Sequence, residues 1–194
     1  ALFDLSLANQ EILNGLDPLD FEVSYYETID NAELETNPIT TPLAYTNVAP
    51  FTQQVYVRVE NIETQCYNTT ALTLIVNELP VLIQPDPLEL CDDNNTGDEV
   101  EEFTLEDSIG QVLNGQTGID ITFHQTQEDA DNAESPILSP YTNIVNAQTI
   151  YIRAENNITG CFNTITLDLR VNPLPSPVEV EPLEACDVDA DGYT

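Results

Sequence analysis

The four cysteines are the side chains of this sequence best suited to covalent chemistry: Cys66, Cys91, Cys161 and Cys186. In an acidic, strand-rich chain they predict an oxidising compartment and disulfide bonds rather than metal binding or catalysis. Pairing by proximity in the sequence would join Cys66 to Cys91 and Cys161 to Cys186.

Strand direction favours another pairing. In a linear array of domains, the last strand of each domain runs from its N-terminal to its C-terminal end, so the turn before that strand, holding Cys161, lies at the N-terminal end. A strand of ten residues spans roughly 33 Å, whereas a disulfide requires Cα atoms within about 7 Å of each other. Cys91 enters the same domain at this N-terminal end, so we predict a bond between Cys91 and Cys161. Cys66 and Cys186 would then pair with copies outside this sequence.

A short acidic loop follows each of two cysteines. Oxygen-bearing side chains alternate before a glycine, which is the pattern of the first half of an EF-hand-like calcium loop. The loop after Cys91 is a degraded match, and neither loop shows the terminal glutamate that usually completes the site, so a solvated acidic turn is the alternative. The predicted calcium ligands are Asp187, Asp189 and Asp191 in one loop and Asp92, Asn94 and Asp98 in the other.

Other groups give little support for catalysis. The chain contains two copies of one module, described below, and the single histidine, His124, stands where Tyr26 stands in the first copy. We therefore expect His124 on a strand face and not in a catalytic site. No pair of nucleophile and base can be assembled from repeated positions, and the sequence therefore predicts no enzyme. Arg58 and Arg153 recur amid many acids, which favours ion-paired structural residues over ligand recognition.

The charge balance excludes one class of partner. The chain has 35 acidic and 3 basic residues, for a formal net charge of −32. It has no basic patch that could neutralise phosphates, so nucleic-acid binding is not expected, and cations are the expected partners. No apolar run reaches the roughly 18 residues of a membrane span, so we predict no membrane insertion.

These residues recur because the chain repeats itself. Val55-Tyr-Val-Arg-Val-Glu-Asn61 matches Ile150-Tyr-Ile-Arg-Ala-Glu-Asn156, and the cysteines, the Asn-Thr pairs and the Leu-Pro ends follow in the same register. We predict one module over residues 1–80, a second over 81–175, and the start of a third over 176–194.

Each module is predicted to be strand-rich. Alternating apolar residues indicate strands near 21–27 and 119–125, and a long terminal hairpin crosses each cysteine-containing turn at 54–76 and 149–171. Short helical turns are expected near 6–13 and 106–113. The predicted fold class is all-β, with tandem Ig-like β-sandwich domains arranged end to end.

The repeated motifs resemble those of a known family. Tyr-x-Arg-x-Glu-Asn, Thr-Gly-Cys-Phe-Asn-Thr, Val-Asn-Pro-Leu-Pro and Leu-Glu-x-Cys-Asp-x-Asp-x-Asp-Gly, as they stand from Tyr151 to Gly192, are similar to the tandem repeats of SprB-like gliding-motility adhesins, which the type IX secretion system of Bacteroidetes exports. The resemblance implies an extracellular location on the cell surface. It also implies a filament that contacts surfaces or polysaccharide and is moved by the gliding machinery.

Two functions therefore remain open. The favoured one is a stalk or adhesive filament whose partners are the neighbouring repeats of the same chain. The alternative is a carbohydrate-binding module in which exposed aromatic side chains, such as Tyr45 and Tyr141, stack on sugars. A paired, exposed aromatic platform would favour the second function, and buried tyrosines would favour the first.

Overall fold

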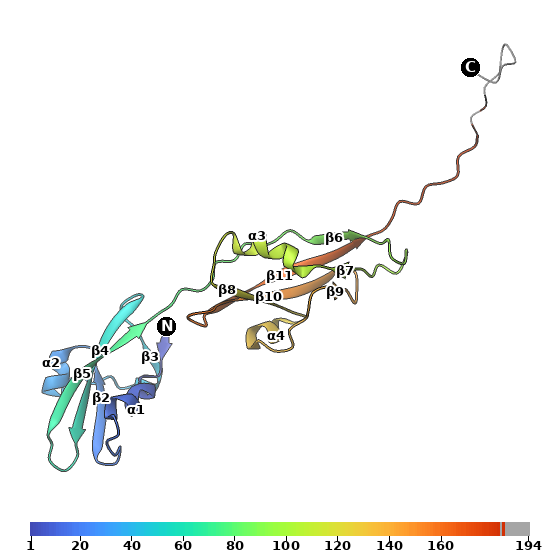
Figure 1. The fold of residues 1–194 in the computed structure, drawn as a ribbon. Helices are drawn as coiled ribbons and strands as arrows, with labels where there is room; N and C mark the ends of the chain where they lie inside the picture. The colour runs from blue at the N-terminus through green and yellow to red at the C-terminus, as the bar shows by residue number, and fades with distance from the viewer. Residues whose placement is uncertain (183, 185–194) are drawn as a thin grey trace. The chain divides into compact units, whose positions relative to one another are not determined.

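A computed structural model describes residues 1–182 and 184 of the chain. The chain divides into two compact units, Ala1–Glu78 and Leu79–Thr194. Both are mostly β with short helices, and most elements of the first unit recur in the same order in the second (Figure 1).

The first unit contains a three-stranded antiparallel sheet in the order β2-β4-β5 and a two-stranded ribbon, β1-β3. Its elements are β1 (Leu2–Phe3), η1 (Leu5–Ala8), α1 (Asn9–Leu13), β2 (Phe21–Tyr26), α2 (Ile29–Leu34), η2 (Pro42–Ala44), β3 (Tyr45–Thr46), β4 (Thr52–Asn61) and β5 (Tyr67–Ile75).

The second unit contains a four-stranded sheet in the order β6-β11-β10-β8 and a ribbon, β7-β9. Strands β8, β10 and β11 pair antiparallel, whereas β6 joins β11 in parallel. Its elements are β6 (Leu88–Cys91), β7 (Glu102–Phe103), η3 (Leu105–Ser108), α3 (Ile109–Leu113), β8 (Ile119–His124), α4 (Gln127–Asn132), β9 (Tyr141–Thr142), β10 (Gln148–Asn156) and β11 (Phe162–Asn172).

Each core lies between one face of the larger sheet and the layer formed by the ribbon and the first helices. In the second unit, Ile150 and Ile152 of β10 pack with Leu167 of β11 against Leu105 and Val112, and all five are fully buried. In the first unit the corresponding sheet residues, Val55 and Val57, are fully buried beside Leu5. Alternation of apolar residues along β4 and β10 produces these faces, because successive strand side chains point to opposite sides.

The short helices begin and end at residues suited to those positions. Thr28 precedes α2, and its hydroxyl accepts a hydrogen bond from the Asn31 amide at 3.2 Å; Thr126 does the same for Asp129 before α4. Such caps satisfy amides that have no partner within the helix. The backbone carbonyls of these two helices take part in the arginine contacts described below.

The described residues of the expected third module, 176–182 and 184, contain no helix or strand. No helix in the described part of the chain is both long enough and apolar enough to cross a membrane.

Candidate functional site

Cys91 lies at the end of the second unit where the chain leaves its last strand. It is the final residue of β6 and stands opposite Asn172, the final residue of β11, in the parallel ladder. The next residue continues the contact, because the Asp92 amide donates to the Asn172 carbonyl at 2.9 Å. The Cys91 thiol is solvent-exposed.

Cys161 lies at the opposite end of the same unit, in the turn between β10 and β11. The Asn156 amide closes this turn by donating to the Cys161 carbonyl at 2.9 Å, and β11 begins at the next residue. The 11 residues of β11 therefore separate the levels of Cys161 and Cys91, a distance of about 35 Å.

The predicted disulfide between Cys91 and Cys161 is therefore wrong, and both thiols are free in the structure. The prediction assumed that Cys91 lies at the same end of the unit as the Cys161 turn. The chain enters the second unit beside the Cys161 turn, but residues 80–91 then run the length of the unit alongside β11 before Cys91 is reached. Asn163 donates to the Pro80 carbonyl at 3.1 Å at one end of this path, and β6 pairs with the end of β11 at the other. Figure 1 shows β6 beside the far end of β11.

In the first unit, Cys66 occupies the place of Cys161. It lies in the turn between β4 and β5 and is exposed, and the Asn61 amide donates to its carbonyl at 2.9 Å. Cys186, the counterpart of Cys91, lies outside the described residues.

The acidic loop after Cys91 is organised around two buried carboxylates. Asp92 is 1% exposed. Its Oδ2 accepts a hydrogen bond from the Gly97 amide at 2.5 Å, which directs the carboxylate into the loop. Its Oδ1 is buried and has no hydrogen-bond partner among the described residues.

Glu101 is the second buried carboxylate, at 4% exposure, and sequence reasoning missed it. Its Oε1 accepts from the amides of Asp93 and Asn94 at 2.8 and 3.0 Å, and its Oε2 accepts from the Asn94 side chain. The repeat comparison could not indicate this residue, because at the spacing that relates Cys91 to Cys186 its counterpart falls outside the sequence. The predicted ligand Asp98 is engaged differently: its oxygens accept from Val100 and Asn95.

Within residues 1–182 and 184, no three acidic, histidine or cysteine side chains are grouped so as to hold a metal ion. A cation in the Asp92 loop would therefore need amide, hydroxyl and carbonyl oxygens as well as carboxylates. The Asp187, Asp189 and Asp191 loop lies outside the described residues.

Arg58 and Arg153 occupy equivalent buried positions, at 6% and 7% exposure. Arg153 pairs with Glu155, its Nη1 donates to the carbonyls of Ala130 and Asp131 in α4, and its guanidinium carbon lies 3.4 Å from the Phe162 ring centroid. Arg58 repeats this arrangement with Glu60, the carbonyls of Ala32 and Glu33, and the Tyr67 ring. Each arginine thus fastens a short helix to the sheet, as expected for a structural residue.

The asparagine that ends each Arg-x-Glu-Asn motif shapes the cysteine-containing turn. The Asn61 side chain accepts from the amides of Glu63 and Thr64 at 3.1 and 2.8 Å, and Asn156 does the same for Ile158 and Thr159. The repeated motif therefore encodes both the arginine clamp and the turn that presents Cys66 or Cys161.

The remaining candidates belong to the cores. His124 is 1% exposed, and its ring nitrogens contact the Thr122 hydroxyl at 2.9 Å and the Glu134 carbonyl at 2.7 Å. The carbohydrate-binding alternative required exposed aromatic side chains, but Tyr45 is 6% exposed and Tyr141 is half-buried. Each hydroxyl instead accepts a hydrogen bond from a glutamine side chain, Gln53 at 2.7 Å and Gln148 at 2.8 Å.

The sequence matches the family described as "Flavobacterium inter-domain disulphide bond domain" twice, over residues 1–80 and 87–175. A comparison with curated proteins finds no match. Among solved structures, a crystal structure of Drosophila N-cadherin EC1-3 matches with 12% sequence identity and a TM-score of 0.30. That match covers 81% of this chain and 57% of the cadherin chain.

Proposed function

The chain belongs to the family of the Flavobacterium inter-domain disulphide bond domain, and from this premise we propose that it is a segment of a long extracellular surface adhesin. In this proposal its copies are Ig-like β-sandwiches arranged end to end. They form a stalk or adhesive filament that acts in cell-surface attachment and gliding motility, as the resemblance to SprB-like repeats implies. Neighbouring copies are the principal partners, and the segment itself performs no catalysis.

The observation that carries the proposal is the position of the thiols at opposite ends of one copy. The chain enters the second unit beside the Cys161 turn and leaves β11 level with Cys91. Covalent connectivity therefore brings the Cys91 end of each copy to the Cys161 end of the following copy.

The spacing along the chain suits a bond at such a junction. Pro175 stands three positions after Asn172, which is level with Cys91. The counterpart of Pro175 in the preceding copy is Pro80, whose carbonyl contacts Asn163, two residues after Cys161. Three extended residues span about 10 Å, so two exposed thiols at a junction can approach within disulfide distance. We propose that the Cys91 type of thiol bonds to the Cys161 type of the next copy, in an oxidising extracellular setting.

Mapping of disulfide-linked peptides tests this arrangement. A chain extended by one period in each direction should yield peptides in which Cys91 is joined to the hairpin cysteine of the following copy. Recovery of Cys66 joined to Cys91, or free thiols in the secreted protein, would contradict the proposal. Small-angle scattering with and without reductant should show a shorter maximum dimension after reduction, because unbridged junctions bend more freely.

The alternative, a carbohydrate-binding module, has less support. Burial of Tyr45 and partial burial of Tyr141 remove the stacking platform on which it depended. Binding of this chain to a glycan array at submillimolar concentration would restore this alternative, and absence of binding is expected.

We further propose that the Asp92 loop binds Ca²⁺. The support is the buried Oδ1 of Asp92, which has no hydrogen-bond partner among the described residues, in a loop that also carries the oxygens of Asn94 and Thr96. Hard cations such as Ca²⁺ take oxygen ligands of these kinds, and sites with few carboxylates bind weakly, in the range of extracellular calcium. A bound cation would also offset part of the charge of −32.

A further inference from the structure

Two segments of the second unit each run from one of its ends to the other, in the same direction. One is residues 80–91, which we call the entry segment, and the other is β11. Near their starts the Asn163 side chain donates to the Pro80 carbonyl at 3.1 Å, and at their ends Cys91 stands opposite Asn172 in the parallel ladder. The unit therefore contains two parallel backbone spans of equal reach.

Contacts between these ends keep the two spans side by side. The Gln84 side chain donates to the Thr166 carbonyl at 2.9 Å, and Leu88 stands opposite Leu169 where the ladder begins. The two spans thus advance together almost residue for residue. This requires the entry segment to be nearly as extended as the strand beside it.

Neither span can lengthen much under tension. From Asn163 to Asn172, β11 already covers about 30 Å. The entry segment covers the same distance with about 11 residues, whose fully extended length is about 36–40 Å. It contains three prolines, Pro80, Pro85 and Pro87, whose fixed φ angles limit rearrangement. Pulling on either span should therefore add less than about 10 Å.

The rest of the second unit lies outside both spans. Residues 92–160 include β7, η3, α3, β8, α4, β9 and β10. The chain joins them to the entry segment after Cys91 and to β11 through the turn before Phe162. A force applied to the two ends of either span does not pass through residues 92–160, so it does not load the antiparallel ladder between β8 and β10.

The cysteines stand where such a force would enter or leave. Cys161 directly precedes β11, and Cys91 is the last residue of the entry segment. The opposite ends lie on the main chain between copies: the second unit begins at Leu79, just before the entry segment, and Asn172 leads out of β11. Each span therefore has one end continued by the main chain and one end marked by a thiol.

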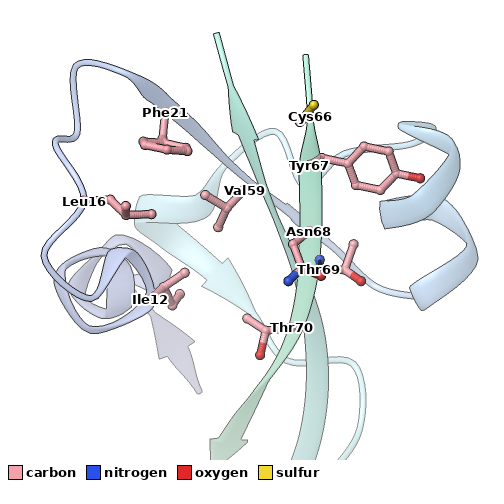
Figure 2. A pocket seen from close by; sticks show the side chains of 9 residues that line it. All are labelled: Ile12, Leu16, Phe21, Val59, Cys66, Tyr67, Asn68, Thr69 and Thr70. Carbon is pink, nitrogen blue, oxygen red and sulfur yellow. Dashed lines mark hydrogen bonds between the residues drawn. The ribbon is translucent and has the colours of Figure 1, made fainter. Parts of the chain in front are cut away.

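The first unit contains the same kind of span after its own cysteine. Figure 2 shows Cys66 at the start of β5, with Tyr67, Asn68, Thr69 and Thr70 following along one extended strand. Their side chains point alternately to opposite sides, as in a regular strand. A thiol at the start of a long extended strand is thus a property of both copies.

We propose that the repeats bear tension through extended covalent backbone instead of through their folded sheets. The inference rests on the disulfides between copies in the proposed function. Through such a bond, the entry segment of one copy continues into the β11 strand of the next copy. That strand continues along the main chain into the entry segment of the copy after it. Two continuous covalent spans then run through the array, and each crosses successive junctions alternately by disulfide and by main chain.

The bonds between copies decide which part of each copy is loaded. Each bond forms when two thiols pass two electrons and two protons to a partner disulfide by thiol–disulfide exchange. With the bonds in place, tension follows the two spans and leaves residues 92–160 unloaded. Without them, the covalent path from copy to copy includes residues 92–160, so each copy resists only as long as its fold survives the force.

The first experiment pulls this chain in optical tweezers through handles attached to pairs of thiols. Cys66→Ser and Cys186→Ser remove two native thiols, and Ser176→Cys supplies an attachment point just beyond β11. With Cys91→Ser added, handles at Cys161 and position 176 load β11 alone. With Cys161→Ser added instead, handles at Cys91 and position 176 load a path that includes residues 92–160.

The two handle pairs should behave in opposite ways. The pair at Cys161 and position 176 should extend smoothly with no unfolding step, because β11 is already extended. The pair at Cys91 and position 176 should unfold the unit and gain about 280 Å, because these points start close together and a long stretch of chain is released between them. A comparable gain from the first pair, or no gain from the second, would overturn the proposal.

A second set of handles tests the entry segment. Val81 is 71% exposed, so Val81→Cys places a handle at the start of this segment without opening the core. Handles at position 81 and Cys91 should again extend smoothly, by less than about 10 Å, whereas handles at positions 81 and 176 should unfold the unit with a gain of about 300 Å. An unfolding step from the pair at position 81 and Cys91 would show that the entry segment does not carry tension.

The third experiment pulls a chain extended by one period in each direction. Copies bridged at both ends should show no unfolding step in the oxidised chain, and each should show a step of about 300 Å after reduction. Unfolding steps of bridged copies, in a chain whose peptide map contains the bonds, would overturn this inference and leave the proposed junction intact. A map without the bonds would overturn the junction, and with it the continuity of the two spans, whatever the handle measurements on one unit show.

Discussion

Cys91 and Cys161 lie at opposite ends of β11, with Cys91 level with Asn172 and Cys161 directly before Phe162. A single copy thus carries one thiol at each end, and neither can reach the other without unfolding the sheet. The arrangement makes each copy a link that can be joined covalently on both sides.

Cys161→Ser should leave the melting temperature of this isolated chain unchanged. A disulfide between Cys91 and Cys161 would close a loop of about 70 residues and contribute a few kcal/mol through restriction of the unfolded state. Both thiols are free in the structure, so no such bond stabilises the second unit. Differential scanning calorimetry of the variant and the parent chain, each with and without reductant, provides the measurement. A clear loss of stability in the oxidised variant would contradict the assignment of Cys161 to a bond between copies.

Arg153→Ala should destabilise the second unit by about 2–4 kcal/mol, because it leaves two α4 carbonyls without donors and removes the stacking on Phe162. Arg153→Lys should recover only part of this loss, since an ammonium cannot reproduce the planar fork of donors. The control is Arg170→Lys, whose side chain is 48% exposed and should change stability by less than about 0.5 kcal/mol. Urea unfolding, with hydrogen exchange resolved to each unit, gives the values.

Tyr25→Phe should alter the alkaline stability of the first unit. Burial, with a smaller effect of Asp4, raises the pKa of Tyr25 to about 12, and its hydroxyl donates to the Leu5 carbonyl at 2.8 Å. Because the pKa in the folded state exceeds the unfolded value of 10.0, this contribution is fully present below pH 10 and is lost as the pH rises towards 12. The variant should be less stable at neutral pH by about 1 kcal/mol.

Between pH 10 and 12 the stability of Tyr25→Phe should fall less steeply than that of the parent chain. Urea midpoints at a series of pH values measure both slopes. Equal slopes would show that Tyr25 does not retain its proton in the folded state over this range.

Asp92→Asn should abolish the rise in melting temperature that Ca²⁺ produces. The substitution removes the charge of the buried carboxylate whose Oδ1 has no partner among the described residues. Asp93→Asn is the matched control and should keep most of the response, because Asp93 is an exposed carboxylate of the same loop and is not among the predicted ligands.

Thermal unfolding in chelator, Mg²⁺ and Ca²⁺ tests the calcium proposal directly. Mg²⁺ should act weakly, since it requires a compact octahedral shell and gives up water reluctantly. Identical melting of the parent chain in all three solutions would show that the loop is an ordinary acidic turn.

The sequence by itself determined the repetition, the strand-rich character and the structural role of the arginines. The repeats are visible in the sequence because equivalent residues have equivalent surroundings in the two units. Arg58 and Arg153 each pair with a glutamate two residues later on the same strand face, so the spacing Arg-x-Glu occurs in both copies. Alternation along 55–59 and 150–154 likewise reports which side chains enter the core, because strand side chains alternate between faces.

Only the tertiary structure decided how the cysteines are placed, whether the tyrosines are exposed and what covers each sheet edge. Residues 80–91 contain three prolines and no long alternating pattern, so nothing local shows that they cross the whole unit and add a parallel strand to β11. Parallel pairing joins segments that lie far apart in the sequence, and its register depends on packing against the core rather than on a turn. That long-range pairing carries Cys91 to the far end of the unit and places the Asp92 loop there.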